Sequence, residues 1–219
     1  MFSRGLCFDL DGTLIDSGPG GLQQIFNVAK ILNLPTPPET EKLLRDMWGQ
    51  HPSNLIKTAW PGTNIGQFYK KWEDLDIANP WSVFPGTKET IEKLFNYFHL
   101  SILTSRNIRT AIPQLEHNDI LQFFGLVIAA DSSPHKKPDP RSIKPILEKY
   151  LDAGVDSKQV IFVGDTVEGD WNLAQATGLE FYAVLSGGMD TREKFLAAGV
   201  PEDHIINSVA DLPKVLLIN

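Results

Sequence analysis

The chain has 219 residues, of which 42% are apolar, and a formal net charge of −7 at pH 7. This length suits one domain with an insertion, or one medium and one small domain, and the apolar content is ample for a packed core. The negative charge disfavours nucleic acid as a partner, since proteins that bind nucleic acid carry basic surfaces. No apolar run approaches the roughly 18 residues of a membrane span, so we expect no membrane partner.

The first apolar run begins a few residues after Met1, which leaves no room for a signal peptide. The single cysteine, Cys7, lies within this run. We therefore expect a buried, reduced thiol in a cytoplasmic protein without an internal disulfide. A catalytic thiol is the alternative, but no basic residue lies beside Cys7 in the sequence, and a reactive thiolate needs such a neighbour.

Residues 5–14 (GLCFDLDGTL) begin as a short apolar run, which predicts a buried strand, and then carry two aspartates followed by a glycine. Side chains at i and i+2 of an extended segment point the same way, so Asp9 and Asp11 address one space at the strand's end. Two facing carboxylates repel each other, and such hard oxygen ligands suit Mg2+. The alternative is an ordinary Asp-Gly hairpin turn, but no second strand follows in the sequence.

Residues 17–82 show helical periodicity and no convincing strand. Apolar spacing predicts a helix with Thr40 as its N-cap, and further helices over residues 21–32, 54–60 and 65–75. Four of the five tryptophans lie in this segment, and we expect them to fill the core of a small helical domain. They are Trp48, Trp60, Trp72 and Trp81.

After residue 86, helices and strands alternate. Apolar runs predict strands over residues 100–103, 126–130, 160–163 and 181–185, and this alternation predicts a parallel sheet with helices on both faces. Ligands of such sheets bind beyond the carboxyl ends of the strands. The residues that follow the five apolar runs are Asp9, then Thr104 and Ser105, Asp131, Gly164 and Asp165, and Ser186 to Gly188. Acids and hydroxyls should therefore gather on one edge of the sheet.

Four segments of the chain resemble, in order, the four sequence motifs of the haloacid dehalogenase-like (HAD) phosphatase superfamily. The first motif is Asp-x-Asp-Gly-Thr, and the second is an apolar strand that ends in a hydroxyl residue. The third is a lysine before Pro-x-Pro, and the fourth is Gly-Asp followed by a second acid. In this chain they are residues 9–13, 101–104, 137–140 and 164–170. The register with Pro-x-Pro favours Lys137 over its neighbour Lys136.

By this resemblance, Asp9 is the nucleophile that forms an aspartyl-phosphate, and Asp11 protonates the leaving oxygen and then activates water. Thr104 donates a hydrogen bond to the phosphoryl group, and Lys137 neutralises it. Ser105 and Arg106 are further candidates for substrate binding. Many relatives have asparagine and then a small or basic residue at these two positions, whereas this chain has serine and then arginine.

The resemblance also implies a Mg2+ site. Asp9, the backbone carbonyl of Asp11 and Asp165 would bind the ion directly, and Asp170 would bind it through water. The interval of five residues between Asp165 and Asp170 is one of the family's variants, and an interval of four is commoner. Glu168 is therefore an alternative residue for part of the role of the second acid.

The implied fold is α/β: a HAD-like, doubly wound and Rossmann-like parallel sheet with a small all-helical cap inserted after the first strand. The core domain would comprise residues 1–16 and 83–219, and the cap residues 17–82. Six cap residues beside a break between helices are candidates for substrate recognition. They are Arg45, Trp48, Gly49, Gln50, His51 and Lys57.

The implied function is Mg2+-dependent hydrolysis of a small phosphate monoester (phosphoglycolate-like, a nucleotide or a sugar phosphate) by a monomer or homodimer. Because the body of the protein is acidic, local cations must attract such an anion. The presence of Asp11 argues against a dehalogenase or a phosphonate-cleaving enzyme, because the members of the superfamily with these activities lack the second aspartate. A sugar-phosphate mutase of the β-phosphoglucomutase type uses the same four motifs and stays open, as does a non-catalytic regulatory or binding protein.

Overall fold

The computed structural model describes residues 4–47 and 52–218. The chain forms two compact units, one made of Met1–Asp16 with Trp81–Asn219 and the other of Ser17–Pro80. The sequence-based boundary after residue 82 lies two residues beyond this division. Among the described residues, no helix combines the length and the apolar character that crossing a bilayer demands.

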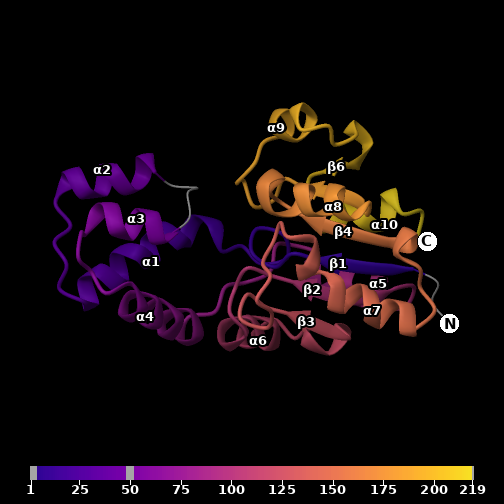
Figure 1. Cartoon of the computed structure of the whole chain (residues 1–219), viewed down its shortest axis with the longest axis horizontal. Helices are drawn as coiled ribbons and strands as arrows, with labels where there is room; N and C mark the ends of the chain where they lie inside the picture. The colour runs from indigo at the N-terminus through magenta and orange to yellow at the C-terminus, as the bar shows by residue number, and fades with distance from the viewer. Residues whose placement is uncertain (1–3, 48–51, 219) are drawn as a thin grey trace. The chain divides into compact units, whose positions relative to one another are not determined.

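The first unit is built on a six-stranded sheet with the strand order β3-β2-β1-β4-β5-β6, and every pair of neighbours is parallel (Figure 1). The strands are β1 (Gly5–Phe8), β2 (His99–Leu103), β3 (Leu126–Ile128), β4 (Val160–Gly164), β5 (Glu180–Val184) and β6 (Ile205–Ile206). The strand order reverses at β1, so the crevice beyond the carboxyl ends of β1, β2 and β4 is the expected ligand site of such a sheet. This confirms the predicted fold class, although β6 was not predicted because two residues carry no periodic signal.

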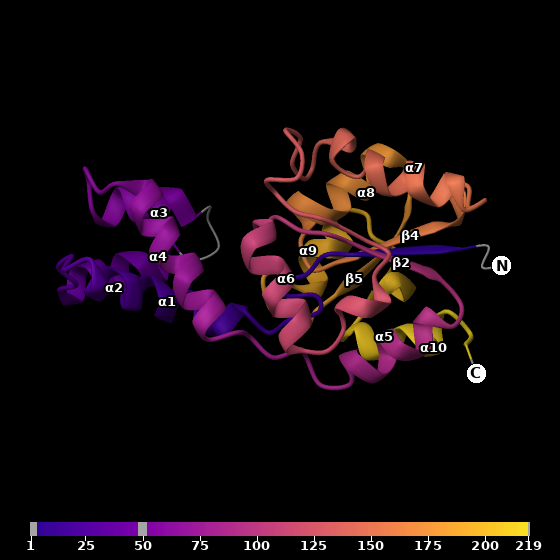
Figure 2. The same cartoon turned by 90° about the horizontal axis from the view of Figure 1, so that it is seen from below.

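Helices cover both faces of the sheet, so β1 and β4 are buried along their whole length. Leu6 and Phe8 of β1 pack in one apolar cluster, and Cys7 between them packs in the other. The first cluster includes side chains of α5 (Thr87–Phe95), α6 (Ile108–His117) and α10 (Leu212–Val215). The second includes side chains of α7 (Lys144–Asp152), α8 (Asn172–Thr177) and α9 (Arg192–Ala197). Figure 2 shows α7 and α8 on one side of the sheet and α5 and α10 on the other.

The described part of the second unit is helical, as predicted. Its helices are α1 (Gly18–Ile31), α2 (Pro38–Asp46), α3 (Pro52–Ala59) and α4 (Ile65–Ala78). Its core contains Trp60, whose ring stacks on Phe68 with 5.8 Å between centroids. The N-cap of α2 is Pro37, so the prediction that Thr40 caps this helix was wrong. Proline supplies a helical φ at the first position of a helix and needs no donor there, and α2 therefore begins earlier.

The expectation that four tryptophans share the helical core holds only in part. Trp72 is partly buried against the same cluster as Trp60. Trp81 instead belongs to the first unit, where it packs against the sheet cluster. Its backbone N–H donates to the Gln114 side chain over 2.7 Å. Trp48 lies outside the described residues.

Candidate active site

The end of β1 places Asp9 at the centre of the sheet edge. The backbone N–H of Asp9 donates to the carbonyl of Val163 over 2.8 Å, which continues the ladder between β1 and β4. Gly12 then turns the chain with a φ of 76°, a conformation that residues with a Cβ rarely adopt. A Cβ on Gly12 would also lie 2.1 Å from the Asp165 carboxylate. The glycine is therefore what allows the two acid-bearing loops to approach each other.

Asp165 follows β4 and is 2% exposed. Both of its carboxylate oxygens are buried, and neither has a hydrogen-bond partner within residues 4–47 and 52–218. A buried charged group without partners is costly, so such a carboxylate calls for a cation. Asp165 is thus the most direct structural indication of a metal site.

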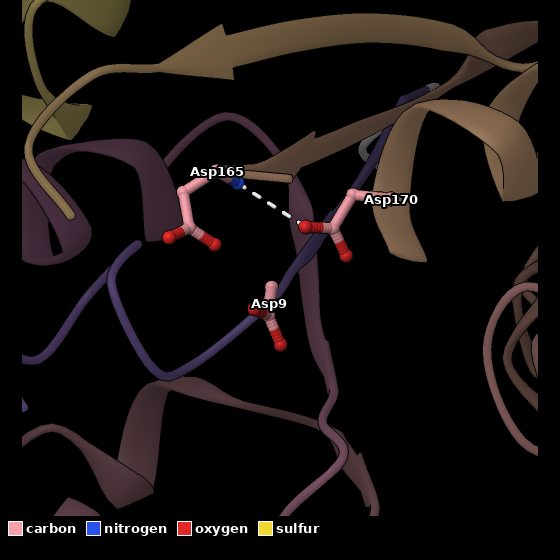
Figure 3. Close-up of side chains that lie close together, drawn as sticks. All are labelled: Asp9, Asp165 and Asp170. Carbon is pink, nitrogen blue, oxygen red and sulfur yellow. Dashed lines mark hydrogen bonds between the residues drawn. The ribbon is translucent and has the colours of Figure 1, made fainter. Parts of the chain in front are cut away.

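Asp170 reaches the same place because the chain makes a π-helical turn, η4 (Val167–Trp171). The Trp171 N–H donates to the Thr166 carbonyl five residues earlier, over 3.1 Å. A π turn contains one more residue than an α turn, and this accounts for the interval of five between Asp165 and Asp170. Asp170 accepts from the Asp165 N–H over 3.2 Å, as Figure 3 shows. Asp170 is fully buried and Glu168 is exposed, so Asp170, and not Glu168, is the acid that lies beside Asp165.

Asp9, Asp165 and Asp170 each offer one oxygen to a cluster in which these atoms lie within 4.8 Å of one another (Figure 3). Burial raises the pKa of Asp9 to about 7, although Lys137 opposes this rise. Burial and then the charge of Asp9 raise the pKa of Asp165 well above its usual range. The three clustered acids therefore call for more positive charge than Lys137 supplies, and their all-oxygen donors fit a hard divalent cation. The Asp11 carboxylate is not part of this cluster.

Lys137 is the cation that the chain itself brings to the cluster. Its Nζ lies 2.7 Å from an oxygen of Asp9 and 2.7 Å from an oxygen of Asp170, and its side chain is 4% exposed. Burial lowers the pKa of Lys137, but Asp170 and Asp9 raise it by more, so the amine stays protonated. Lys136 is exposed. The structure thus places Lys137, and not its neighbour, among the acids.

The loop after β2 contributes Thr104, Ser105 and Arg106. Thr104 is 3% exposed, and its hydroxyl accepts from the Arg106 N–H over 3.0 Å. The Arg106 guanidinium pairs with both oxygens of Asp11: Nε donates over 3.0 Å and Nη2 over 2.5 Å. Ser105 is exposed. The sequence did not predict the ion pair, although β1 and β2 are neighbours and both residues follow the ends of these strands.

Two other strand-end segments have structural roles. The Asp131 side chain accepts from the Ile108 N–H over 2.8 Å and so caps α6. The Ser186 hydroxyl donates to the Gly12 carbonyl over 3.1 Å. A Cβ on Gly187 would lie 2.4 Å from an Asp165 oxygen and 2.7 Å from Gly12 Cα. The loop after β5 therefore closes over the Asp165 side of the cluster.

Asp190 is a positioning residue that the sequence reasoning missed. It is 8% exposed, and its carboxylate accepts from the Val167 N–H over 2.6 Å at the start of η4. Lys194 Nζ lies 2.5 Å from the other oxygen of Asp190. In the sequence, Asp190 only marks the start of a helix. Its contact with Val167, 23 positions earlier, leaves no local pattern in the sequence.

The candidate substrate-recognition residues in the second unit fall into two groups. Trp48, Gly49, Gln50 and His51 lie outside the described residues. Arg45 lies over the Phe26 ring, 5.8 Å from its centroid, and Lys57 is exposed on α3.

Comparisons with known proteins agree with this architecture. The chain is 28% identical over 192 residues to a phosphoglycolate phosphatase of Pseudomonas fluorescens strain Pf0-1, covering 81% of this chain and 67% of that protein. It is 26% identical over 229 residues to a phosphoglycolate phosphatase of Nitrosospira multiformis, covering 97% and 95% of the two chains. A haloacid dehalogenase-like family hydrolase from Streptococcus pneumoniae has a similar structure, with a TM-score of 0.75 at 22% identity over 97% and 98% of the two chains.

The family model described as haloacid dehalogenase-like hydrolase matches residues 6–184, a segment that begins in β1 and ends with β5. This segment carries Asp9, Lys137 and the two acids that meet them at the sheet edge. Because this family model matches more than half of the chain, the chain belongs to the haloacid dehalogenase-like hydrolase family. The order of the strands in the sheet agrees with this assignment.

Proposed function

We propose that this chain is a Mg2+-dependent phosphatase that hydrolyses a small phosphate monoester through a phosphorylated Asp9. The observation that carries the proposal is the buried Asp165 carboxylate, which has no hydrogen-bond partner in the described chain and lies beside Asp9 and the paired Lys137. The relatives named phosphoglycolate phosphatase support a small, anionic ester as the first substrate to test.

The residues present fit Mg2+. Asp165 has two buried oxygens without a hydrogen-bond partner among the described residues, so it would bind the ion directly, together with Asp9 and the backbone carbonyl of Asp11. Both Asp170 oxygens already accept hydrogen bonds, one from Lys137 and the other from Thr166, and this favours a contact through water. When bound, the ion supplies a Lewis acid that stabilises charge on the phosphoryl oxygens.

Residues of the chain itself then act as the nucleophile, as the general acid and base, and as the groups that bind the phosphoryl oxygens. An Asp9 oxygen attacks phosphorus, the bond from phosphorus to the ester oxygen breaks, and Asp11 gives its proton to the leaving oxygen. Water next attacks the phosphorus of the aspartyl-phosphate, Asp11 takes the proton, and the bond to Asp9 breaks to release phosphate. Lys137 fixes Asp9 over 2.7 Å and neutralises the phosphoryl group, and the Thr104 hydroxyl donates to it.

The test is release of phosphate from phosphoglycolate, nucleoside monophosphates and sugar phosphates, with Mg2+ or with EDTA. Asp9→Asn keeps the shape of the side chain but removes the nucleophile, so we expect Mg2+-dependent release that this variant abolishes, with its melting temperature as the control for folding. Conversion of glucose 1-phosphate to glucose 6-phosphate would instead indicate the mutase. Mg2+ binding without turnover of any ester would refute the phosphatase and favour a binding protein.

A further inference from the structure

Both ends of the π turn η4 are tied to one segment, which consists of α9 and its flanking residues. At the start of the turn, the Asp190 carboxylate accepts from the Val167 N–H over 2.6 Å. At its end, the Trp171 indole N–H donates to the carbonyl of Ala198, the C-cap of α9, over 3.0 Å. Residues 190–198, called the brace below, therefore hold the turn at two points.

The brace is itself fixed in the core of the first unit. Phe195 of α9 is fully buried, and its ring centroid lies 6.4 Å from that of Phe181 in β5. The Trp171 ring packs on the same Phe181, with 5.6 Å between centroids. Lys194 balances the charge of Asp190 over 2.5 Å. The two hydrogen bonds to η4 thus come from a segment that is anchored to the sheet.

The π turn depends on such contacts from outside. A π turn is a rare conformation, and the first N–H groups of a helical turn find no acceptor within the turn. The hydroxyl of Thr166, the N-cap residue of η4, donates to Asp170 over 2.7 Å instead of capping the turn. Asp190 therefore supplies the acceptor that an N-cap side chain commonly supplies.

The turn in turn places Asp170, whose two oxygens connect the loop after β4 to the lysine. One oxygen accepts from Lys137 over 2.7 Å, and the other accepts from the N–H groups of Asp165 and Thr166 over 3.2 and 3.0 Å. Lys137 also lies 2.7 Å from Asp9. Because hydrogen bonds weaken steeply with distance and angle, a shift of Asp170 would disturb all of these contacts together.

We propose that the brace sets the affinity of the acid cluster for Mg2+, with Asp190 and Trp171 as positioning residues that act through η4 and Asp170. This inference rests on the proposed function, in which Asp9 and Asp165 bind the ion. Residues that orient the ligands of a metal from outside commonly change its affinity 10- to 100-fold when they are replaced.

The first experiment needs neither metal nor substrate. Amide hydrogen exchange of the full chain in EDTA, followed by NMR, compares wild type with Asp190→Ala. We expect exchange at Val167 to be about 10- to 100-fold faster, because a hydrogen bond to a charged acceptor is lost. The amides of Asp165 and Thr166 should follow, since they donate to Asp170, whereas those of β2 should not. Unchanged exchange at Asp165 and Thr166 would overturn the proposal, because Asp190 would then only cap the turn.

The second experiment measures Mg2+ binding by calorimetry. We expect Asp190→Ala to raise the Kd about tenfold or more. Asp190→Asn keeps an oxygen that accepts from Val167 and should restore most of the affinity. Trp171→Phe keeps a ring but loses the donor to Ala198, so it should also raise the Kd, and it takes the place of Asp190→Ala if that variant does not fold. A Kd equal to that of wild type would refute the role of the brace.

Thr191→Ala is the matched control, because it weakens α9 without touching η4. The Thr191 hydroxyl caps α9 by accepting from the Lys194 N–H over 3.3 Å, so its loss should lower Tm but leave the exchange at Asp165 and the Kd unchanged. An equal rise in Kd for this variant and Asp190→Ala would overturn the proposal.

The two experiments separate failure of this inference from failure of the proposed function. A wild-type chain that binds no Mg2+ would refute the proposed function, and the affinity part of this inference with it. Normal Mg2+ binding with no effect of Asp190→Ala on exchange or Kd would refute this inference alone.

Discussion

Replacing Lys137 by methionine tests whether the cluster depends on this buried cation. The change removes the charge that lies 2.7 Å from both Asp9 and Asp170 and leaves two buried carboxylates without it. Breaking a buried ion pair from one side costs about 3–5 kcal/mol. For a chain of this size 1 kcal/mol shifts Tm by about 2–4 °C, so we expect a loss of about 6–20 °C in EDTA at pH 8. Lys136→Met, at the exposed neighbour, should leave Tm nearly unchanged.

The pH dependence of this loss has a definite sign. Lys137 lowers the pKa of Asp9, which is about 7 when the lysine is present, so the variant's Asp9 has a still higher pKa. Folded carboxyls with raised pKa values bind protons more tightly than the unfolded chain does, so stability falls as pH rises from the ordinary carboxyl range to the raised value. The Tm deficit of Lys137→Met should therefore be smaller at pH 5 than at pH 8. Equal melting of the two lysine variants, or a deficit independent of pH, would refute this reasoning.

Three further outcomes are expected. Mg2+ must displace protons from carboxyls of the cluster such as Asp9, whose pKa is raised to about 7, so the rise in Tm caused by Mg2+ should shrink as the pH falls below 7. A rise in Tm that stays constant between pH 5.5 and 8.5 would contradict this. Gly187→Ala places a Cβ 2.4 Å from an Asp165 oxygen, so it should destabilise the chain by about 1–3 kcal/mol and weaken Mg2+ binding in calorimetry. Gly66→Ala in α4, where the Cβ would lie 3.4 Å from the Asn64 side chain, is its control. Cys7 is fully buried and burial raises its pKa, so iodoacetamide should label it only after unfolding, as mass spectrometry would detect.

The fold was predictable because each strand of the central sheet is a short apolar run buried on both faces. The runs at β1, β2, β4 and β5 were located within one or two residues of their observed bounds. The errors lie where local patterns are weak or ambiguous. β6 is only two residues long, and the prolines before Thr40 allow more than one helix start. Family membership and the doubly wound sheet are confirmed, because they depend on the order of the segments and not on their exact ends.

The candidate site was predictable to the extent that strand ends determine it. Parallel strands bring their carboxyl ends to one edge, which is why Asp9 and Asp165 were expected together and lie together in the structure. Lys137 was found through its place before Pro-x-Pro, since no strand leads directly to it. The functional roles of all three residues stay predictions until the variants are measured.

Contacts made by the side chains of neighbouring loops were not predictable in the same way. The sequence placed Arg106 and Asp11 on the same edge, but whether arginine meets a carboxylate or points into solvent depends on the path of the loop, which the Thr104 and Ala130 hydrogen bonds set. The interval of five at Asp165 and Asp170 is a similar case. It appeared as a departure from the commoner spacing, and the π turn of η4 absorbs the extra residue. Because Asp190 accepts from the first N–H of that turn, the position of Asp170 depends on a residue 20 positions downstream, which no reading of the local motif includes.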